Sequence, residues 1–282
     1  MNVLSLFAGI GGFDLGLERA GMRVVAQCEF DPFCQKVLKK HWPDVPCYPD
    51  VRELTREVLI DDGIISDTES NGRRQEHTND RGRTGGSGTK QGARSGGGSQ
   101  GGAKTNATNP GPIDLICGGY PCQPFSHAGK REGAADDRHL WPEMHRLIET
   151  IRPRWVIAEN VAGHISMGLD DVLADLEGSG YACWTFVIPA CAVDARHRRD
   201  RVWIVADNDS CRPFRPRANG RQQDTRANGR DNITWGGRWP TEPSICRVAH
   251  GIPQRVDRLK ALGNAVVPAV VQRIGEAIME SQ

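Results

Sequence analysis

A cysteine stands in a turn rich in glycine and proline, directly after an apolar run. Cys122 follows Pro121 in the stretch GGYPCQPFSHAGK, and the apolar stretch IDLIC leads into this turn. Such a run predicts a buried strand, so the thiol would lie at the carboxyl edge of a sheet, where open α/β folds bind ligands. A thiol at the junction of a loop and a helix can have a lowered pKa. Cys122 could be a nucleophile, a small buried residue, half of a disulfide or a metal ligand.

The cysteine pattern and the apolar runs narrow these alternatives. The chain holds nine cysteines and none belongs to a CxxC pair, so we expect no zinc-knuckle and no metal site. No apolar run reaches the roughly 18 residues that a membrane span needs. The apolar N-terminal stretch has no basic residues before it, which argues against a signal peptide. We therefore expect a cytoplasmic protein without membrane contact, in which disulfides do not form.

A carboxylic acid is expected near Cys122. Glu159 ends the predicted strand RWVIAENV and would emerge at the same edge of the sheet. A cysteine and an acid that face one pocket suggest covalent attack assisted by proton donation.

A basic run, RHRRDR, precedes another predicted strand. Arg199 and Arg201 would point to the same side of an extended chain and could face an anion or a polar ligand. Arg196 and Arg198 could contact phosphates. The alternative is a basic run that is only solvated.

Three stretches near the N-terminus could form a cofactor site. Gly9 and Gly11 follow the first predicted strand, but Asp14 occupies the sixth place of a GxGxxG pattern, so a ligand-binding turn and a bare tight turn both remain open. Glu29 ends the second strand, where an acid commonly accepts hydrogen bonds from a ribose diol. Asp50 could bind an adenine amino group or cap a helix. Together these residues favour an adenosine-type cofactor.

Alternating strands and helices are expected to position these residues. The predicted strands span 1–12, 23–30, 112–119, 154–161, 182–190 and 200–206. The predicted helices span 13–22, 31–43, 139–153, 169–181 and 265–281. Asp31 should cap the second helix with Pro32 at its first position, and Gly21 should end the first helix. This alternation predicts an α/β protein with a parallel sheet.

Two segments do not follow this alternation. Residues 61–112 are polar and rich in glycine, and we interpret them as a flexible insertion. The stretch after the last predicted strand is rich in arginine, asparagine and glycine and repeats the sequence ANGR. We therefore divide the chain into a catalytic domain (1–206), a short and poorly regular recognition region (207–250) and a C-terminal segment (251–282) that returns to the first domain.

The chain resembles the DNA cytosine-5 methyltransferase family of bacterial or phage restriction-modification systems. Six blocks of its sequence match the family and occur in the family's order. The blocks are LFAGIGG, EFD, DLICGGYPCQPFS, ENV, RHRRDR and LGNAVVP, and they run from Leu6 to Pro268. The resemblance implies a Rossmann-like domain that binds S-adenosyl-L-methionine, together with a small target-recognition region. It assigns the cofactor site to Phe7, Gly9, Gly11, Glu29, Asp50, Pro121 and Asn264.

The same resemblance implies a mechanism. The Cys122 thiolate would add to C6 of cytosine, and a protonated Glu159 would hydrogen-bond N3 and offset the charge that develops there. Arg199 would bind O2 of the ring, with Arg201 supporting the site. C5 would then accept the methyl group. The base must leave the stacked duplex for this chemistry.

The partners also follow from the resemblance. Double-stranded DNA would be the substrate, contacted by Gln123, Ser126 and Arg198, and a cognate restriction endonuclease is a possible partner of a monomeric enzyme. Two alternatives remain: a methyltransferase acting on cytosine C5 in RNA, and a catalytically silent DNA-binding relative.

Overall fold

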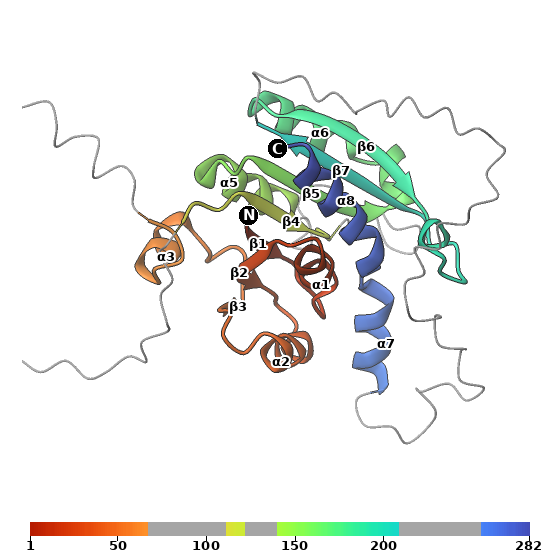
Figure 1. Cartoon of the computed structure of the whole chain (residues 1–282), viewed down its shortest axis with the longest axis horizontal. Helices are drawn as coiled ribbons and strands as arrows, with labels where there is room; N and C mark the ends of the chain where they lie inside the picture. Colours follow the sequence, from red (N-terminus) through yellow and green to blue (C-terminus); the bar gives the residue numbers. More distant parts are fainter. Residues whose placement is uncertain (67–110, 122–139, 209–254) are drawn as a thin grey trace, which may run out of the picture.

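The computed structural model describes residues 1–66, 111–121, 140–208 and 255–282. Its centre is a seven-stranded sheet with the strand order β3-β2-β1-β4-β5-β7-β6 (Figure 1). The strands are β1 (Asn2–Leu6), β2 (Arg23–Cys28), β3 (Cys47–Tyr48), β4 (Leu115–Gly118), β5 (Trp155–Val161), β6 (Ala182–Ile188) and β7 (Arg201–Asp207). The first five strands in this order pair in parallel, whereas β7 runs antiparallel to both of its neighbours.

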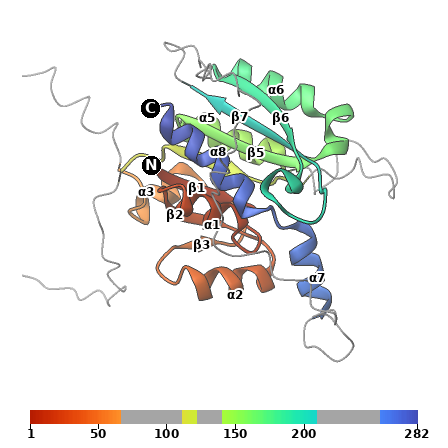
Figure 2. The same cartoon turned by 45° about the vertical axis from the view of Figure 1, so that its right-hand side comes forward.

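Helices cover both faces of the sheet (Figure 2). They are α1 (Gly12–Arg19), α2 (Pro32–His41), α3 (Arg56–Asp61), α5 (Trp141–Ile151), α6 (Leu169–Gly178), α7 (Arg255–Asn264) and α8 (Pro268–Glu280), with the short 3-10 helices η2 (Ala162–Ser166) and η3 (Ala190–Val193). Side chains of β1 alternate between the faces: Leu4 and Leu6 pack with α3, α5 and α6, and Val3 packs with α1 and α8. This arrangement confirms the predicted α/β fold class.

The predicted helix ends agree with the local chemistry. The Asp31 side chain accepts a hydrogen bond from the backbone N–H of Phe33, and Pro32 is the first residue of α2. After α1, Gly21 has a φ of 87° and its N–H bonds back to the carbonyl of Glu18. A left-handed residue at this position commonly ends a helix, and glycine adopts that conformation without a steric cost.

Two predictions about local structure were wrong or incomplete. Helix α7 was not predicted, because its apolar residues do not mark one buried face: Val256 and Leu262 are both exposed. The alternative role of Asp50 as a helix cap is wrong, since α3 begins only at Arg56, where the side chain of Thr55 accepts from a backbone N–H.

Most of the segments outside the predicted alternation fall outside the described residues. Ile65, within the predicted insertion, is buried against the core of the sheet. Within the described ranges, no helix is long and apolar enough to cross a membrane.

Helices α1 and α8 approach each other closely because glycines lie between them. A Cβ added to Gly16 would come within 2.5 Å of Cβ of Val271 and 2.7 Å of the carbonyl oxygen of Pro268. A Cβ added to Gly275 would lie 2.8 Å from Cβ of Ala20. Because glycine has no side chain at these two positions, the two helix backbones can lie close together. This contact joins α8 to the N-terminal part of the fold.

We predict that Gly16→Ala destabilises the protein. The added methyl group cannot fit between the helices, and overpacking of this kind costs about 1–3 kcal/mol. Gly178→Ala is the matched control, because none of the described atoms lies within 4 Å of its Cβ position at the end of α6. The control should raise the free energy of unfolding by up to about 1 kcal/mol through helix propensity. Denaturant unfolding measures both, and equal effects of the two variants would contradict the prediction.

Candidate functional site

The turn after β1 has an unusual backbone. Phe7, Gly9 and Gly11 have φ values of 51°, 57° and 85°. A Cβ on Gly11 would overlap the ring of Trp42, whereas among the described residues no atom lies within 4 Å of a Cβ on Gly9. Trp42 therefore packs against the turn at Gly11, whereas the turn is open at Gly9, as a turn that approaches a ligand must be.

The carboxylate of Glu29 lies against this turn. One oxygen accepts from the backbone N–H of Gly9 at 2.7 Å, and the other accepts from the N–H of Asp31 at 2.7 Å. Burial raises the pKa of Glu29, and the two N–H groups oppose this shift. Each carboxylate oxygen can accept a second hydrogen bond, so a ribose diol could still bind.

A further aromatic residue follows Glu29 directly. Phe30 has a side chain that is 70% exposed at the carboxyl end of β2. An exposed aromatic ring beside a carboxylate is a candidate contact for a flat ligand. The block EFD contained this residue, but its exposure could not be read from the sequence.

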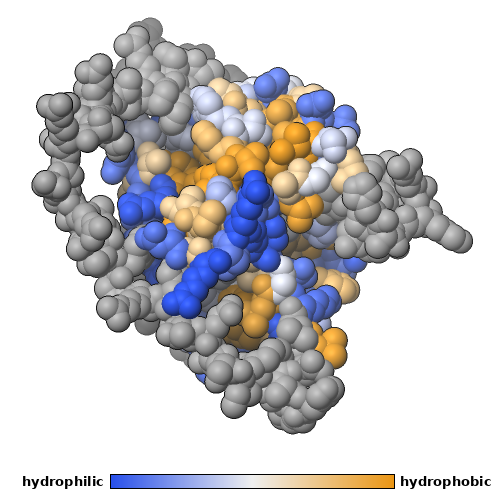
Figure 3. Space-filling model, turned by 90° about the vertical axis from the view of Figure 1, so that its right-hand side faces the viewer, coloured by the Kyte–Doolittle hydropathy of each residue, from blue (hydrophilic) through white to orange (hydrophobic). Residues whose placement is uncertain are grey.

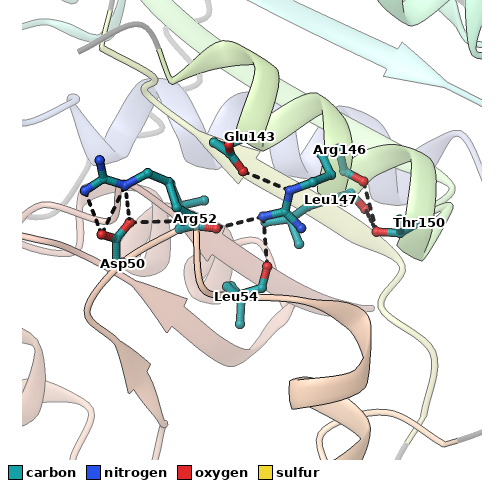
Figure 4. Close-up of polar contacts among 8 residues, drawn as sticks. Asp50, Arg52, Leu54, Glu143, Arg146, Leu147 and Thr150 are labelled. Atoms are coloured by element: carbon teal, nitrogen blue, oxygen red, sulfur yellow. Dashed lines mark hydrogen bonds and ion pairs between the residues drawn. The ribbon is translucent and has the colours of Figure 1, made fainter. Parts of the chain in front are cut away.

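Asp50 lies on a second turn, and its carboxylate is already paired. It accepts from Nε and Nη2 of Arg52, the latter at 2.7 Å, and this pair lowers its pKa (Figure 4). Arg146 of α5 fixes the same turn by donating to the carbonyls of Val51 and Leu54 (Figure 4). An adenine amino group would therefore share the Asp50 carboxylate with Arg52.

The glycine pair Gly118–Gly119 at the end of β4 lies between the turn after β1 and Glu159. A Cβ on Gly118 would lie 2.7 Å from the carbonyl oxygen of Leu6 and 3.2 Å from Cδ2 of Phe7. A Cβ on Gly119 would lie 2.9 Å from Oε2 of Glu159. This turn therefore contacts both the turn after β1 and the acid at the end of β5, and side chains at these positions would push them apart.

Glu159 is a buried acid with an arginine partner. Nε of Arg201 lies 2.9 Å from Oε1 of Glu159. Burial raises the pKa of Glu159 to about 7, although Arg201 and Arg199 act in the opposite direction. Desolvation therefore exceeds the attraction of the two cations, and the carboxyl group can hold a proton near neutral pH.

The residues around Glu159 fix the chain that leads toward Cys122. The side-chain amide of Asn160 donates to the carbonyl of Tyr120 at 3.1 Å, and the hydroxyl of Tyr120 lies 2.7 Å from Nε2 of the buried His164. The sequence pattern did not identify these three residues as part of the site. A polar residue directly after Glu159 on an apolar strand was the available sign.

The arginines are placed differently from the prediction. Strand β7 begins at Arg201, so Arg199 lies before it with a φ of 42°. Nη2 of Arg199 donates to the backbone carbonyls of Gly263 and Ala265. The side chain of Arg198 is 82% exposed and pairs with Asp200.

The remaining predicted residues differ in what can be said of them. Asn264 is exposed at the end of α7, and Pro121 is half-buried directly after Tyr120. The predicted site residues Cys122, Gln123 and Ser126 lie outside the described residues.

Figure 3 views the molecule from the edge toward which β4 and β6 point in Figure 1. Hydrophobic side chains gather on this face beside hydrophilic ones. Four large apolar side chains that are exposed lie within two residues of residues described above: Phe30, Val161, Ile165 and Leu262.

The chain is similar in sequence to known DNA methylases. The family model described as C-5 cytosine-specific DNA methylase matches residues 1–66 and 100–231. The Type II methyltransferase M.FnuDI of Fusobacterium nucleatum is 28% identical over 211 residues, which are 73% of this chain and 46% of that protein. M.AquIA of Picosynechococcus sp. is 28% identical over 220 residues, covering 73% of this chain and 71% of that protein. The chain thus spans about half the length of M.FnuDI.

Two solved structures have the same fold. A protein described as a DNA modification methyltransferase from an E. coli prophage has a TM-score of 0.50 at 23% identity, and the match covers 75% of this chain and 47% of that one. A mutant of DNMT2 from Spodoptera frugiperda has a TM-score of 0.51 at 18% identity, with 77% and 53% of the two chains covered. At this identity the likeness concerns the fold alone.

We predict that the buried carboxyl of Glu159 makes stability fall as the pH rises. In the folded protein it holds its proton up to about pH 7, whereas in the unfolded chain it loses it near its ordinary value of 4.5. Between these values the folded state binds more protons, so raising the pH favours unfolding. From about pH 5 to pH 8, the wild type should lose roughly 2–3 kcal/mol of unfolding free energy relative to Glu159→Gln. Denaturant unfolding at several pH values measures this, and a difference independent of pH would mean that Glu159 is charged throughout.

Proposed function

Because the chain belongs to the C-5 cytosine-specific DNA methylase family, we propose that it transfers a methyl group from S-adenosyl-L-methionine to C5 of a cytosine in double-stranded DNA. The observation that carries the proposal is the buried Glu159, which has a pKa of about 7 and lies against the glycine turn that leads to Cys122. A proton donor in this position is what activation of a neutral cytosine requires.

The described residues fit the cofactor. The turn after β1 is open at Gly9, and the Glu29 carboxylate beside it retains the capacity to accept from a diol. Phe7 would stack on the adenine, with Asp50 at the edge of that ring and Gly11 beneath the methionine end. Pro121 and Asn264 would complete the site. S-adenosylmethionine supplies an electrophilic methyl group when it is bound.

The chain's own side chains carry the activation of the base. The Cys122 thiolate attacks C6 and forms a C–S bond, while the electrons of the C5–C6 double bond move toward N3. Glu159 donates its proton to N3, so that no full negative charge develops on the ring. C5 is then an enamine carbon and accepts the methyl group. As the methyl group leaves the sulfonium sulfur for C5, N3 returns its proton to Glu159. Loss of the C5 proton to solvent and expulsion of the Cys122 thiolate then restore the aromatic ring.

The two arginines have separate places in this scheme. Arg201 holds the Glu159 carboxyl through Nε, which orients the acid toward the base. Arg199 uses Nη2 for backbone carbonyls, and within the described part of the chain its Nε and Nη1 make no hydrogen bond. These groups would be available to O2 of the cytosine.

The DNA must present the cytosine outside the duplex, since C6 and C5 cannot be reached within the stack. Gln123 and Ser126, next to the nucleophile, would contact the opened DNA, and the exposed Arg198 would contact phosphate. We further infer a cognate restriction endonuclease, since the relatives are named Type II methyltransferases. We also propose that the enzyme is monomeric and cytoplasmic.

Transfer of labelled methyl groups to duplex DNA tests the proposal. Wild-type protein should incorporate label, and Cys122→Ser should lose this activity by several orders of magnitude, because a serine hydroxyl is not ionised near neutral pH. Cys191→Ser is the matched control, since Cys191 is an exposed free cysteine outside the site, and it should retain activity.

Two outcomes would contradict the proposal. Incorporation into tRNA but not into DNA would move the substrate to RNA. DNA binding by the wild type without methyl transfer, and without a covalent adduct on duplex DNA that contains 5-fluorocytosine, would indicate a catalytically silent relative.

A further inference from the structure

The guanidinium of Arg199 binds the backbone of a segment that is distant in the sequence. Nη2 lies 2.6 Å from the carbonyl oxygen of Gly263 and 2.7 Å from that of Ala265. These carbonyls are at the C-terminal end of α7, where carbonyl groups lack an N–H partner within the helix and where a cation is favoured. Arg199 also has a φ of 42°, which is unfavourable for a residue with a side chain. The surrounding structure therefore holds Arg199 in one orientation.

The segment that Arg199 holds continues onto the start of α1. A Cβ added to Gly12 would lie 2.7 Å from Cγ2 and 2.9 Å from the carbonyl oxygen of Val266. Gly12 is the first residue of α1 and follows the turn in which the N–H of Gly9 binds Glu29. The connection between α7 and α8 is thus in contact with Arg199 on one side and with the candidate cofactor site on the other.

A second contact joins α7 to the same site. Nζ of Lys260 lies 3.0 Å from Oδ2 of Asp31, whose backbone N–H donates to Glu29. The side chain of Lys260 is 64% exposed, so this pair alone contributes little. Figure 2 shows α7 continuing from the end of α8 that lies beside α1. Because the Lys260–Asp31 pair is largely exposed, the two hydrogen bonds of Arg199 constrain the connection between α7 and α8 more strongly than that pair does.

We propose that Arg199 is a positioning residue for the cofactor site. By binding the carbonyls of Gly263 and Ala265, it holds the connection between α7 and α8 against the start of α1. The residue that would bind the cytosine thereby also shapes the place where the cofactor binds, before any DNA is present. The inference rests on the proposed function, because it takes the turn after β1 as the cofactor site.

Binding of S-adenosylhomocysteine in the absence of DNA tests this inference, because no base contact contributes to the measurement. Arg199→Ala should weaken binding about tenfold, since two hydrogen bonds from a charged group are lost. Arg199→Lys should lose less, because one ammonium group can replace part of the contact. Calorimetry measures the dissociation constants, and thermal unfolding checks that each variant is folded.

Arg152→Ala is the matched control. Arg152 also has a positive φ, of 55°, and donates from Nη1 to the carbonyl of Ser179 at the end of α6, at 2.7 Å. It precedes β5 and so lies at the opposite edge of the sheet. This variant loses one hydrogen bond from a guanidinium to a carbonyl at a helix end and should bind S-adenosylhomocysteine as the wild type does.

A double-mutant cycle separates positioning from general loosening. Val266→Ala removes the side chain that contacts Gly12, and should weaken binding through the same connection. The effects of Arg199→Ala and Val266→Ala should then be less than additive. Binding by Arg199→Ala equal to that of the wild type, or full additivity, would overturn the inference and leave the proposed function intact. Absence of binding by the wild type would overturn the proposed function and the inference with it.

Discussion

A buried carboxyl group sets the geometry of the site. Glu159 can keep a proton near neutral pH only because it is removed from water, and it is removed from water only if the backbone approaches it closely. Gly119 allows that approach, since a side chain there would collide with the acid. Arg201 then compensates the charge when the proton is lost. The turn after β4, the end of β5 and the start of β7 are all constrained by this one group.

Much of the fold could be predicted from the sequence, because its parallel strands are apolar runs and residues typical of helix ends mark where its helices begin and end. Asp31 and Pro32 mark the start of α2, and Gly21 follows the end of α1. Helix α7 could not be predicted in this way. Among its described side chains only that of Ala261 is buried, and its hydrogen-bond partners, Arg199 and Asp31, lie far along the chain.

The sequence offered candidate site residues by type and position, but it did not show which partners hold their side chains. Glu159 and Glu29 could be identified from their places at the ends of strands. The sequence could not show that Arg199 turns toward backbone carbonyls while Arg201 pairs with the acid, because a left-handed residue before β7 breaks the alternation of an extended chain. The partners of Asn160 and His164 were equally hidden, since both meet a residue some forty positions away.

The close packing of α8 on α1 has a consequence for how the protein is made. Trp155, Trp203 and Val3 lie on the face of the sheet that α8 covers. Domains generally fold as units during synthesis, and this one cannot close that face until residues 268–280 have left the ribosome. Until then the nascent chain carries an exposed apolar surface that is open to aggregation or to a chaperone. The order of synthesis thus delays the close contact between α1 and α8 until long after α1 itself has been made.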